Sequence, residues 1–218
     1  DIRPDTFNMD ETKIEALITE KTKAIIPVHL FGQLCSMDEI QRIAEKHGLR
    51  IIEDSAQSIG ARYGEKKTGQ LGDVCCIFLY PTKNLGGVGD CGMLVTDNEQ
   101  LAAKLKILRA HGAYPDKYSH KYVGINSRLD AIQAVVLQEK LNHLDEWSGK
   151  RRDNAQFYDR MITHSQVLQE KVTIPYNDPK AYHIYNQYSI LVEERDEVLD
   201  FLSRNQVGAA IYYYKPLH

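Results

Sequence analysis

The sequence predicts an α/β protein, with a mostly parallel sheet flanked by helices and a smaller α+β domain after it. An apolar run, an amphipathic helix pattern and a second apolar run follow one another within residues 22–53. Two further apolar runs occur at 74–79 and 92–96, and short strand and helix patterns alternate beyond residue 162. A strand–helix–strand unit needs a right-handed crossover, which places its two strands parallel in one sheet.

The first unit carries a signal for each of its elements. Residues 22–30 contain a run of Ala, Ile and Val, which is typical of a strand buried on both faces. Ser36 and Glu39 have the spacing of a capping box, so we expect a helix to begin there. Gly48 suits the left-handed residue at its end, and residues 49–53 then form the second strand.

Two more strands are expected at residues 74–79 and 92–96. The segment between them, residues 80–91, contains Pro81 and several glycines, which are typical of a loop. Ligands of α/β proteins collect where parallel strands end, so a loop in this place suits a small-molecule site.

Helices are expected to dominate the next part of the chain. Asp97 is expected to cap a helix that ends near Arg109. A long helix is then expected from about Asp130 towards Met161, with an apolar stripe along its first half. Because this helix is longer than most helices within one domain, we interpret it as a connector between two domains.

We expect the domain boundary near Ile162. Residues 1–162 then form a large α/β domain that includes the connecting helix, and residues 163–218 form a small α+β domain. In the second domain we expect strands at 185–192 and 209–213, with a helix at 195–205 between them. The sequence ends without a closing element, so we expect this domain to be incomplete.

Charge and composition exclude several classes of partner. The net charge of -3 comes from 27 basic and 30 acidic residues that are mixed along the chain, so we expect no nucleic-acid partner. No apolar run reaches the roughly 18 residues of a membrane span and no signal peptide is evident, so we expect no membrane partner and a cytoplasmic location. The four cysteines and the histidines lack metal-ligand spacing, so we expect reduced thiols and no metal.

Three positions are candidates for a functional site. Asp54 ends a predicted parallel strand, where a carboxylate either binds a ligand or caps the next helix. Lys83 lies in the glycine-containing loop and is either a Schiff-base lysine or a solvated surface charge. The glycines that follow it match neither the dinucleotide fingerprint nor the Walker A motif. Asn126 and Arg128 suit a phosphate or carboxylate, or else an ordinary helix cap with a surface arginine.

Taken together, these segments resemble the DegT/DnrJ/StrS family of sugar aminotransferases along almost the whole chain. The residues that carry the resemblance are HLFGQ at 29–33, IEDSAQ at 52–57, GDV at 72–74, YPTKNLG at 80–86, GDCG at 89–92, RAHG at 109–112, GINSRLD at 124–130 and YYKPLH at 213–218. The resemblance implies the fold-type I aminotransferase architecture and pyridoxal 5'-phosphate (PLP) as cofactor.

The resemblance also implies roles for individual residues. Lys83 is the lysine that carries PLP, Asp54 pairs with the pyridine nitrogen, and Gln57 lies against the ring. A carboxylate at that nitrogen keeps it protonated, so that the ring accepts an electron pair, while the lysine serves as acid and base. Relatives that are PLP sugar dehydratases carry histidine in place of Lys83, so this residue favours amino transfer.

The implied reaction is transamination of a 3- or 4-keto sugar nucleotide, often deoxygenated, with glutamate as amino donor. It would serve the synthesis of amino sugars, surface polysaccharide or glycosylated natural products. The implied assembly is a homodimer with shared active sites, in which Asn126 binds the PLP phosphate of the partner's site and Arg128 meets donor or sugar nucleotide. The alternative is a PLP-binding relative without turnover, with a regulatory role.

The chain departs from the family pattern at two places. The family's N-terminal portion, with a Ser-Gly-Thr phosphate loop, has no counterpart in this sequence. Phe78 stands five residues before Lys83, where the family commonly has a serine that contacts the phosphate. Either one phosphate contact is replaced from elsewhere, by Asn126 above all, or Phe78 faces the core and a neighbour takes the serine's direction.

Overall fold

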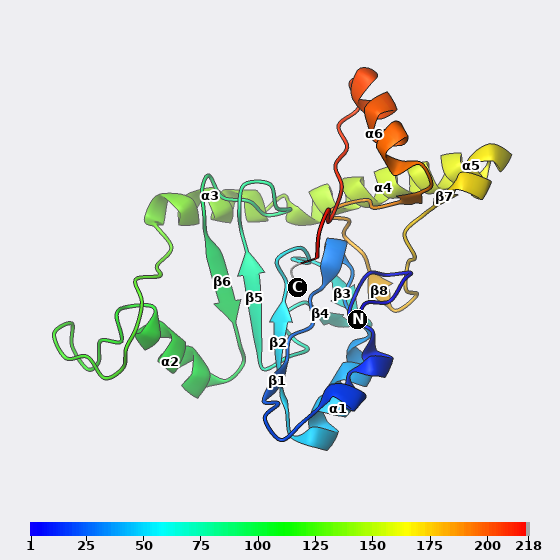
Figure 1. Cartoon of the computed structure of the whole chain (residues 1–218). Helices are drawn as coiled ribbons and strands as arrows, with labels where there is room; N and C mark the ends of the chain where they lie inside the picture. Colours follow the sequence, from blue (N-terminus) through cyan, green and yellow to red (C-terminus); the bar gives the residue numbers. More distant parts are fainter. Residues whose placement is uncertain (217–218) are drawn as a thin grey trace.

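A four-stranded sheet lies at the centre of the protein in the computed structural model, which describes residues 1–216 (Figure 1). Its strands, in the order β1, β2, β5, β6, are Ala24–Ile25, Arg50–Asp54, Val74–Phe78 and Gly92–Val95. The first three are parallel, and β6 runs antiparallel to β5. The predicted α/β class with a mostly parallel sheet is confirmed. Leu217 and His218, the last residues of the motif at 213–218, lie outside the described residues.

Helix α1, Met37–His47, forms the predicted crossover from β1 to β2, and its apolar face is buried. It ends as predicted at Gly48, whose φ of 63° is left-handed. The predicted capping box is wrong in detail. Glu39 forms an ion pair with Arg42 instead of reaching back, and the Ser36 side chain makes no capping hydrogen bond.

The first strand is shorter than predicted. Within residues 22–30 only β1 is a strand, followed by a single bridge between Val28 and Asp54. Pro27 interrupts the ladder because proline has no N–H to donate. The expected burial on both faces is also wrong, since Ile26 is 52% exposed.

Helix α2, Glu99–Leu108, follows β6. Its cap is Asn98 rather than the predicted Asp97, because Asn98 Oδ1 accepts the N–H of Leu101 at 2.9 Å. Asp and Asn are equally good caps, so the residue types alone do not choose between these neighbours. Within residues 1–216, no helix combines the length and the apolar character needed to cross a bilayer.

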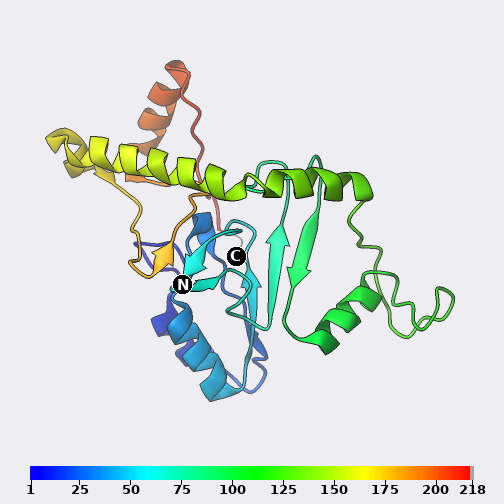
Figure 2. The same ribbon diagram turned by 180° about the vertical axis from the view of Figure 1, so that it is seen from behind.

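The long helix predicted from Asp130 to Met161 consists of two helices, α3 at Ala131–Leu141 and α4 at Leu144–Thr163. Asn142 and His143 bond to carbonyls only three residues back, which tightens the last turn of α3 and ends it. The two helices nevertheless follow one another end to end along one side of the molecule (Figure 2).

The remaining chain forms short elements, namely α5 at Gln166–Lys171, β7 at Val172–Thr173, β8 at Ala181–Tyr182, β9 at Leu191–Val192 and α6 at Arg195–Arg204. β7 pairs with β9, whereas β8 joins β3, Arg62–Tyr63, which also pairs with β4, Lys66–Lys67. Residues 181–182 therefore pack on the earlier part of the chain. The division into domains at Ile162 stays a prediction.

Both strands predicted in this last part are wrong as drawn from the sequence. Of residues 185–192, only β9 is a strand, because Tyr185 has a φ of 45°, outside the extended region. Residues 209–213 are not a strand, and among the described residues no neighbouring strand pairs with them. Apolar and aromatic residues alone therefore do not make a strand where a pairing partner is lacking.

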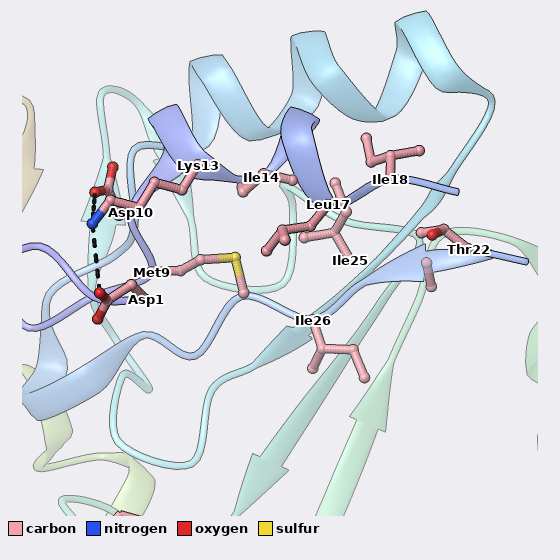
Figure 3. A pocket seen from close by; sticks show the side chains of 11 residues that line it. Asp1, Met9, Asp10, Lys13, Ile14, Leu17, Ile18, Thr22, Ile25 and Ile26 are labelled. Carbon is pink, nitrogen blue, oxygen red and sulfur yellow. Dashed lines mark ion pairs between the residues drawn. The ribbon is translucent and has the colours of Figure 1, made fainter. Parts of the chain in front are cut away.

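Two buried apolar clusters hold the fold together. One lies between α1 and the β1–β2 side of the sheet, and the other joins the loop after β5 to α3 and α4 through Leu79, Leu85, Leu137 and Leu144. A hollow of about 240 Å³ beside β1 is lined by apolar side chains including Leu17 and Ile25 (Figure 3). None of the five predicted site residues lines this hollow.

His183, just after β8, is a buried histidine that stacks on Tyr185 with ring centroids 3.9 Å apart. Its Nδ1 accepts the N–H of Tyr185 at 3.0 Å. Burial lowers its pKa to about 3, with a smaller contribution from Arg152 and partial opposition from the Gly32 carbonyl. The folded protein therefore keeps this imidazole neutral at any pH above that value.

We expect His183 to make the protein acid-sensitive. Between pH 6.5, the ordinary histidine pKa, and about pH 3, this histidine is protonated in the unfolded chain but neutral in the folded protein. The free energy of unfolding therefore falls as the pH falls through this range. Two pH units of this window correspond to at most about 2.7 kcal/mol. Urea unfolding of His183→Asn should show a flatter dependence between pH 6.5 and about 4.5, while exposed His164→Asn should not. Equal slopes in both variants would contradict this assignment.

Candidate active site

The carboxyl ends of the parallel strands bring two predicted site residues to one edge of the sheet. Asp54 is the last residue of β2, and Lys83 lies in the loop that follows the neighbouring strand β5. The Asp54 backbone is fixed on both sides, since its N–H bonds to the Pro27 carbonyl at 2.9 Å and its carbonyl accepts the N–H of His29 at 3.0 Å. This edge is where α/β proteins bind ligands.

The Asp54 carboxylate is only half used by the protein. Oδ1 accepts the N–H of Ala56 at 3.0 Å, whereas no hydrogen bond within residues 1–216 reaches Oδ2. Asp54 Oδ1 therefore holds the turn that follows β2 rather than capping a helix, and its role toward a ligand stays a prediction.

The loop that carries Lys83 is tightly folded. The N–H of Lys83 bonds to the Tyr80 carbonyl at 2.9 Å, and the N–H of Gly87 bonds to the Leu79 carbonyl at 2.8 Å. A Cβ added to Gly86 would lie 2.5 Å from the Pro81 carbonyl oxygen, so only glycine fits there. The turn therefore fixes the backbone from which the lysine side chain leaves.

The surroundings of Lys83 favour its neutral amine. Partial burial lowers the pKa of Lys83, and the negative charge of Asp54 opposes this effect in part. The two side chains are not close enough for an ion pair in the part of the chain described. Nζ lies 5.4 Å from the ring centre of Phe78, a cation–π distance.

Phe78 faces the site rather than the core. Its side chain is 41% exposed, and its ring stacks on Tyr80 at a centroid distance of 5.8 Å. The alternative that Phe78 packs into the core is therefore wrong. A phenyl ring occupies the approach to Lys83, where it offers a face to the ammonium but no hydrogen-bond donor.

Gln57 is buried and holds two segments together. Its Oε1 accepts the N–H of Phe31 at 2.6 Å, and its Nε2 donates to the Tyr213 hydroxyl at 3.2 Å. Phe31 has a left-handed φ of 58°, so this bond supports an uncommon backbone turn. The predicted contact of Gln57 with a cofactor ring stays a prediction.

A buried pair that was not predicted from the sequence adjoins Asp54. It consists of His29, whose N–H bonds to the Asp54 carbonyl, and Glu53, the residue before Asp54 in β2. His29 Nδ1 accepts the N–H of Cys35, so Nε2 carries the proton and donates to Glu53 at 3.1 Å. Burial alone would raise the pKa of Glu53, but hydrogen bonds from His29 and from the backbone of residues 69–72 lower it. The HLFGQ and IEDSAQ segments contain this pair, yet only the fold shows that they meet.

Asn126 and Arg128 lie on the surface, just before α3. Both are exposed, and Arg128 Nε donates to Asn126 Oδ1 at 3.1 Å. Residue 126 also forms a bridge with Ala110. No hydrogen bond or ion pair among the described residues joins either side chain to Lys83, Asp54 or Gln57.

Neither a disulfide nor a metal-binding cluster is found among residues 1–216. All four cysteines are free thiols, and burial raises the pKa of Cys35 and Cys75 to about 12. Residues 1–216 contain no group of three or more His, Cys, Asp or Glu side chains that could hold a metal ion. The predicted site residues near the end of β2 thus carry an amine on Lys83, a carboxylate on Asp54 and an amide on Gln57.

Comparison with known proteins gives consistent results. The model of the DegT/DnrJ/EryC1/StrS aminotransferase family matches residues 1–218. A pleiotropic regulatory protein of Geobacillus stearothermophilus is 46% identical over 218 residues, 100% of this chain and 58% of that protein. The UDP-N-acetyl-3-dehydro-alpha-D-glucosamine 3-aminotransferase of Acidithiobacillus ferrooxidans is 41% identical over 212 residues, 97% of this chain and 56% of that protein.

Solved structures confirm the fold. DesV of S. venezuelae, determined in complex with a ketimine intermediate, is similar with a TM-score of 0.94 and 37% identity, covering 100% of this chain and 57% of that chain. This chain thus spans a little over half the length of the relatives it matches. Since the family model covers every residue, including the Lys83 loop and the end of β2, the chain belongs to the DegT/DnrJ/EryC1/StrS aminotransferase family.

Proposed function

We propose that this protein transfers an amino group to a keto sugar nucleotide, using PLP held by Lys83. The observation that carries the proposal is the meeting of Lys83 and Asp54 at one edge of the parallel sheet. A partly buried amine with a lowered pKa there is suited to covalent chemistry with a carbonyl. Its relatives support the reaction class, because the A. ferrooxidans protein is named as an aminotransferase of a keto sugar nucleotide.

The residues present would fit PLP at two opposite positions of its ring, the aldehyde and the pyridine nitrogen. Lys83 supplies the amine that binds its aldehyde, and Asp54 Oδ2 supplies an acceptor, without a protein partner in the described residues, for a protonated pyridine nitrogen. Gln57, whose amide bonds to Phe31 and Tyr213, would lie against the ring. When bound, PLP supplies a ring that accepts the electron pair of a carbon losing its proton.

Lys83 and Asp54 have different roles in the proposed reaction. The Asp54 carboxylate holds a proton on the pyridine nitrogen by charge. The lowered pKa of Lys83 keeps a larger share of its amine neutral, so that Nζ can take a proton from the substrate carbon and return it elsewhere. Because Lys83 stays tethered within reach, this transfer benefits from a high effective concentration.

We further propose a 3- or 4-keto sugar nucleotide as acceptor and glutamate as donor. A homodimer would complete the site, with Asn126 reaching the partner's PLP phosphate and Arg128 the donor carboxylate or the sugar nucleotide. Their exposure supports this arrangement. An exchange of this kind is reciprocal in a two-fold symmetric dimer.

The proposed function can be tested with a panel of UDP-, dTDP- and GDP-linked keto sugars and with amino acids as donors. We expect glutamate alone to convert the absorbance of lysine-bound PLP to that of pyridoxamine phosphate, and one keto sugar nucleotide to restore it. Mass spectrometry then identifies the amino sugar. A protein whose PLP spectrum no amine changes would contradict the proposal.

A regulatory role without turnover is the second candidate, because the G. stearothermophilus relative bears a regulatory name. The same spectrum separates the two functions. A regulator that only binds PLP would keep its absorbance in glutamate and release no amino sugar.

We expect Phe78→Ser to strengthen PLP binding. A hydroxyl can donate to the phosphate where the ring cannot, and a hydrogen bond to a charged group contributes about 1.5–3 kcal/mol. Because Phe78 is partly exposed, the loss of packing should be small. Equilibrium PLP titration should show a dissociation constant roughly tenfold lower, with Phe78→Leu as a control of similar size that lacks the donor. Weaker binding in Phe78→Ser alone would show that the ring itself holds Lys83 or the cofactor.

A further inference from the structure

Asn84, the residue next to Lys83, is tied to a segment a hundred residues away. Its side chain is 7% exposed and makes two hydrogen bonds. Nδ2 donates to the Ile184 carbonyl at 3.3 Å, and Oδ1 accepts from Asn186 Nδ2 at 2.7 Å. The amide of Asn84 is thus satisfied by residues that follow β8.

The segment that holds Asn84 is itself firmly anchored. The N–H of Ile184 bonds to the Gly32 carbonyl at 3.0 Å, and the N–H of Asn186 bonds to the Phe31 carbonyl at 2.8 Å. On its other side, Arg151 Nη1 donates to the Asn186 carbonyl at 3.3 Å and to the one before it at 3.1 Å. These contacts use only the backbone of Asn186, and its side chain bonds to Asn84.

Close packing leaves this junction little room to move. A Cβ added to Gly32 would lie 2.9 Å from Ile184 Cδ1 and 3.0 Å from the Asn186 nitrogen, and Gly32 has a left-handed φ of 102°. The same turn contains Phe31, whose N–H bonds to Gln57. The turn at residues 31–32 therefore holds both the segment that binds Asn84 and the side chain of Gln57.

Lys83 has no comparable anchor of its own. Within residues 1–216, its Nζ makes no hydrogen bond, so the direction of the side chain depends on the backbone on either side. The Lys83 N–H bond to Tyr80 fixes one side. The hydrogen bonds of the Asn84 side chain fix the other.

We propose that Asn84 and Asn186 are a positioning pair, which orients Lys83 by tying its loop to the segment at 183–186. This proposal rests on the proposed function, in which Lys83 carries PLP. It makes the C-terminal part of the chain a requirement for lysine reactivity, although that part supplies neither the amine nor the carboxylate. Neither residue contacts Nζ, so each acts through the backbone.

The test is a double-mutant cycle of Asn84→Ala and Asn186→Ala, with Asn177→Ala as the matched control. Asn177 donates its amide to the Tyr185 hydroxyl at 2.6 Å, so its loss removes a hydrogen bond to the same segment without touching Asn84. The first readout is the rate at which added PLP attaches to Lys83, followed by absorbance. The second is acetylation of Lys83 by limiting acetic anhydride without PLP, measured by peptide mass spectrometry against exposed Lys66.

We expect each single variant to slow PLP attachment roughly threefold to tenfold, since Asn186→Ala removes one hydrogen bond and Asn84→Ala removes two. The double variant should be no slower than the worse single one, because the two residues act together. Acetylation of Lys83 should change relative to Lys66, and Asn177→Ala should leave both readouts unchanged. Serine at either position, which keeps a polar group, serves if an alanine variant fails to fold.

Two results would overturn the positioning pair, namely unchanged attachment and acetylation in folded variants, or additive losses in the double variant. Failure of the proposed function looks different. In that case borohydride reduction of the unmodified protein would place the pyridoxyl group on a lysine other than Lys83, or on none.

Discussion

Lys83→Ala is expected to abolish covalent PLP attachment and to lower the rate of amino transfer at least about a thousandfold. The substitution removes the only group proposed to bind the aldehyde and to move the substrate proton, and such acid–base steps contribute about 10²- to 10⁴-fold by themselves. Absorbance of the PLP-loaded protein and single-turnover kinetics measure both effects.

The matched control is Lys66→Ala, which removes an exposed lysine of β4 and should retain the spectrum and turnover. Borohydride reduction followed by peptide mapping should label Lys83 in the unmodified protein. A pyridoxyl group on Lys66 or Lys67 would mean that the lysine was assigned wrongly.

The parts of the site that the sequence predicts are those specified locally. Asp54 ends an apolar run and Lys83 follows another, so the rule that ligands collect at the ends of parallel strands predicts both at one edge of the sheet, while their roles toward PLP rest on the family resemblance and stay a prediction. Gly48 ends α1 as expected because its conformation depends on its own backbone. Each of these features is set by a few neighbouring residues.

The features that the sequence misses depend on contacts over long distances along the chain. Asn84 and Asn186 are separated by 102 positions, and neither shows a periodicity that would pair them. Residues 185–192 look like a strand in composition, but the first two of them bond to Phe31 and Arg151 instead of to a neighbouring strand. Pro27 shortens β1 because it has no N–H to donate, which a pattern of apolar residues does not reveal.

Asn126 and Arg128 illustrate a different limit. Their residue types suit phosphate and carboxylate, but in the described residues their side chains bond to each other and to neither Lys83 nor Asp54. A role in the partner's site is therefore a prediction about assembly. Loss of PLP from Asn126→Ala on dilution, measured together with the oligomeric state, would support it.

Asp54→Asn is expected to keep PLP bound to Lys83 but to slow amino transfer at least about a hundredfold. The amide preserves the size of the side chain and the Oδ1 acceptor for Ala56, so the turn after β2 should remain intact. It lacks the negative charge that holds a proton on the pyridine nitrogen. A hundredfold loss in rate corresponds to roughly 2.7 kcal/mol of lost transition-state stabilisation.

The measurement that isolates this effect compares the rate of the glutamate half-reaction with the affinity for PLP. Asp54→Asn should reduce the first and leave the second within a few fold, whereas a folding defect would reduce both. Asp97→Asn, which removes an exposed carboxylate just before α2, should change neither. Near-normal half-reaction rates in Asp54→Asn would remove this carboxylate from the mechanism and leave it only the structural role of holding the turn at Ala56.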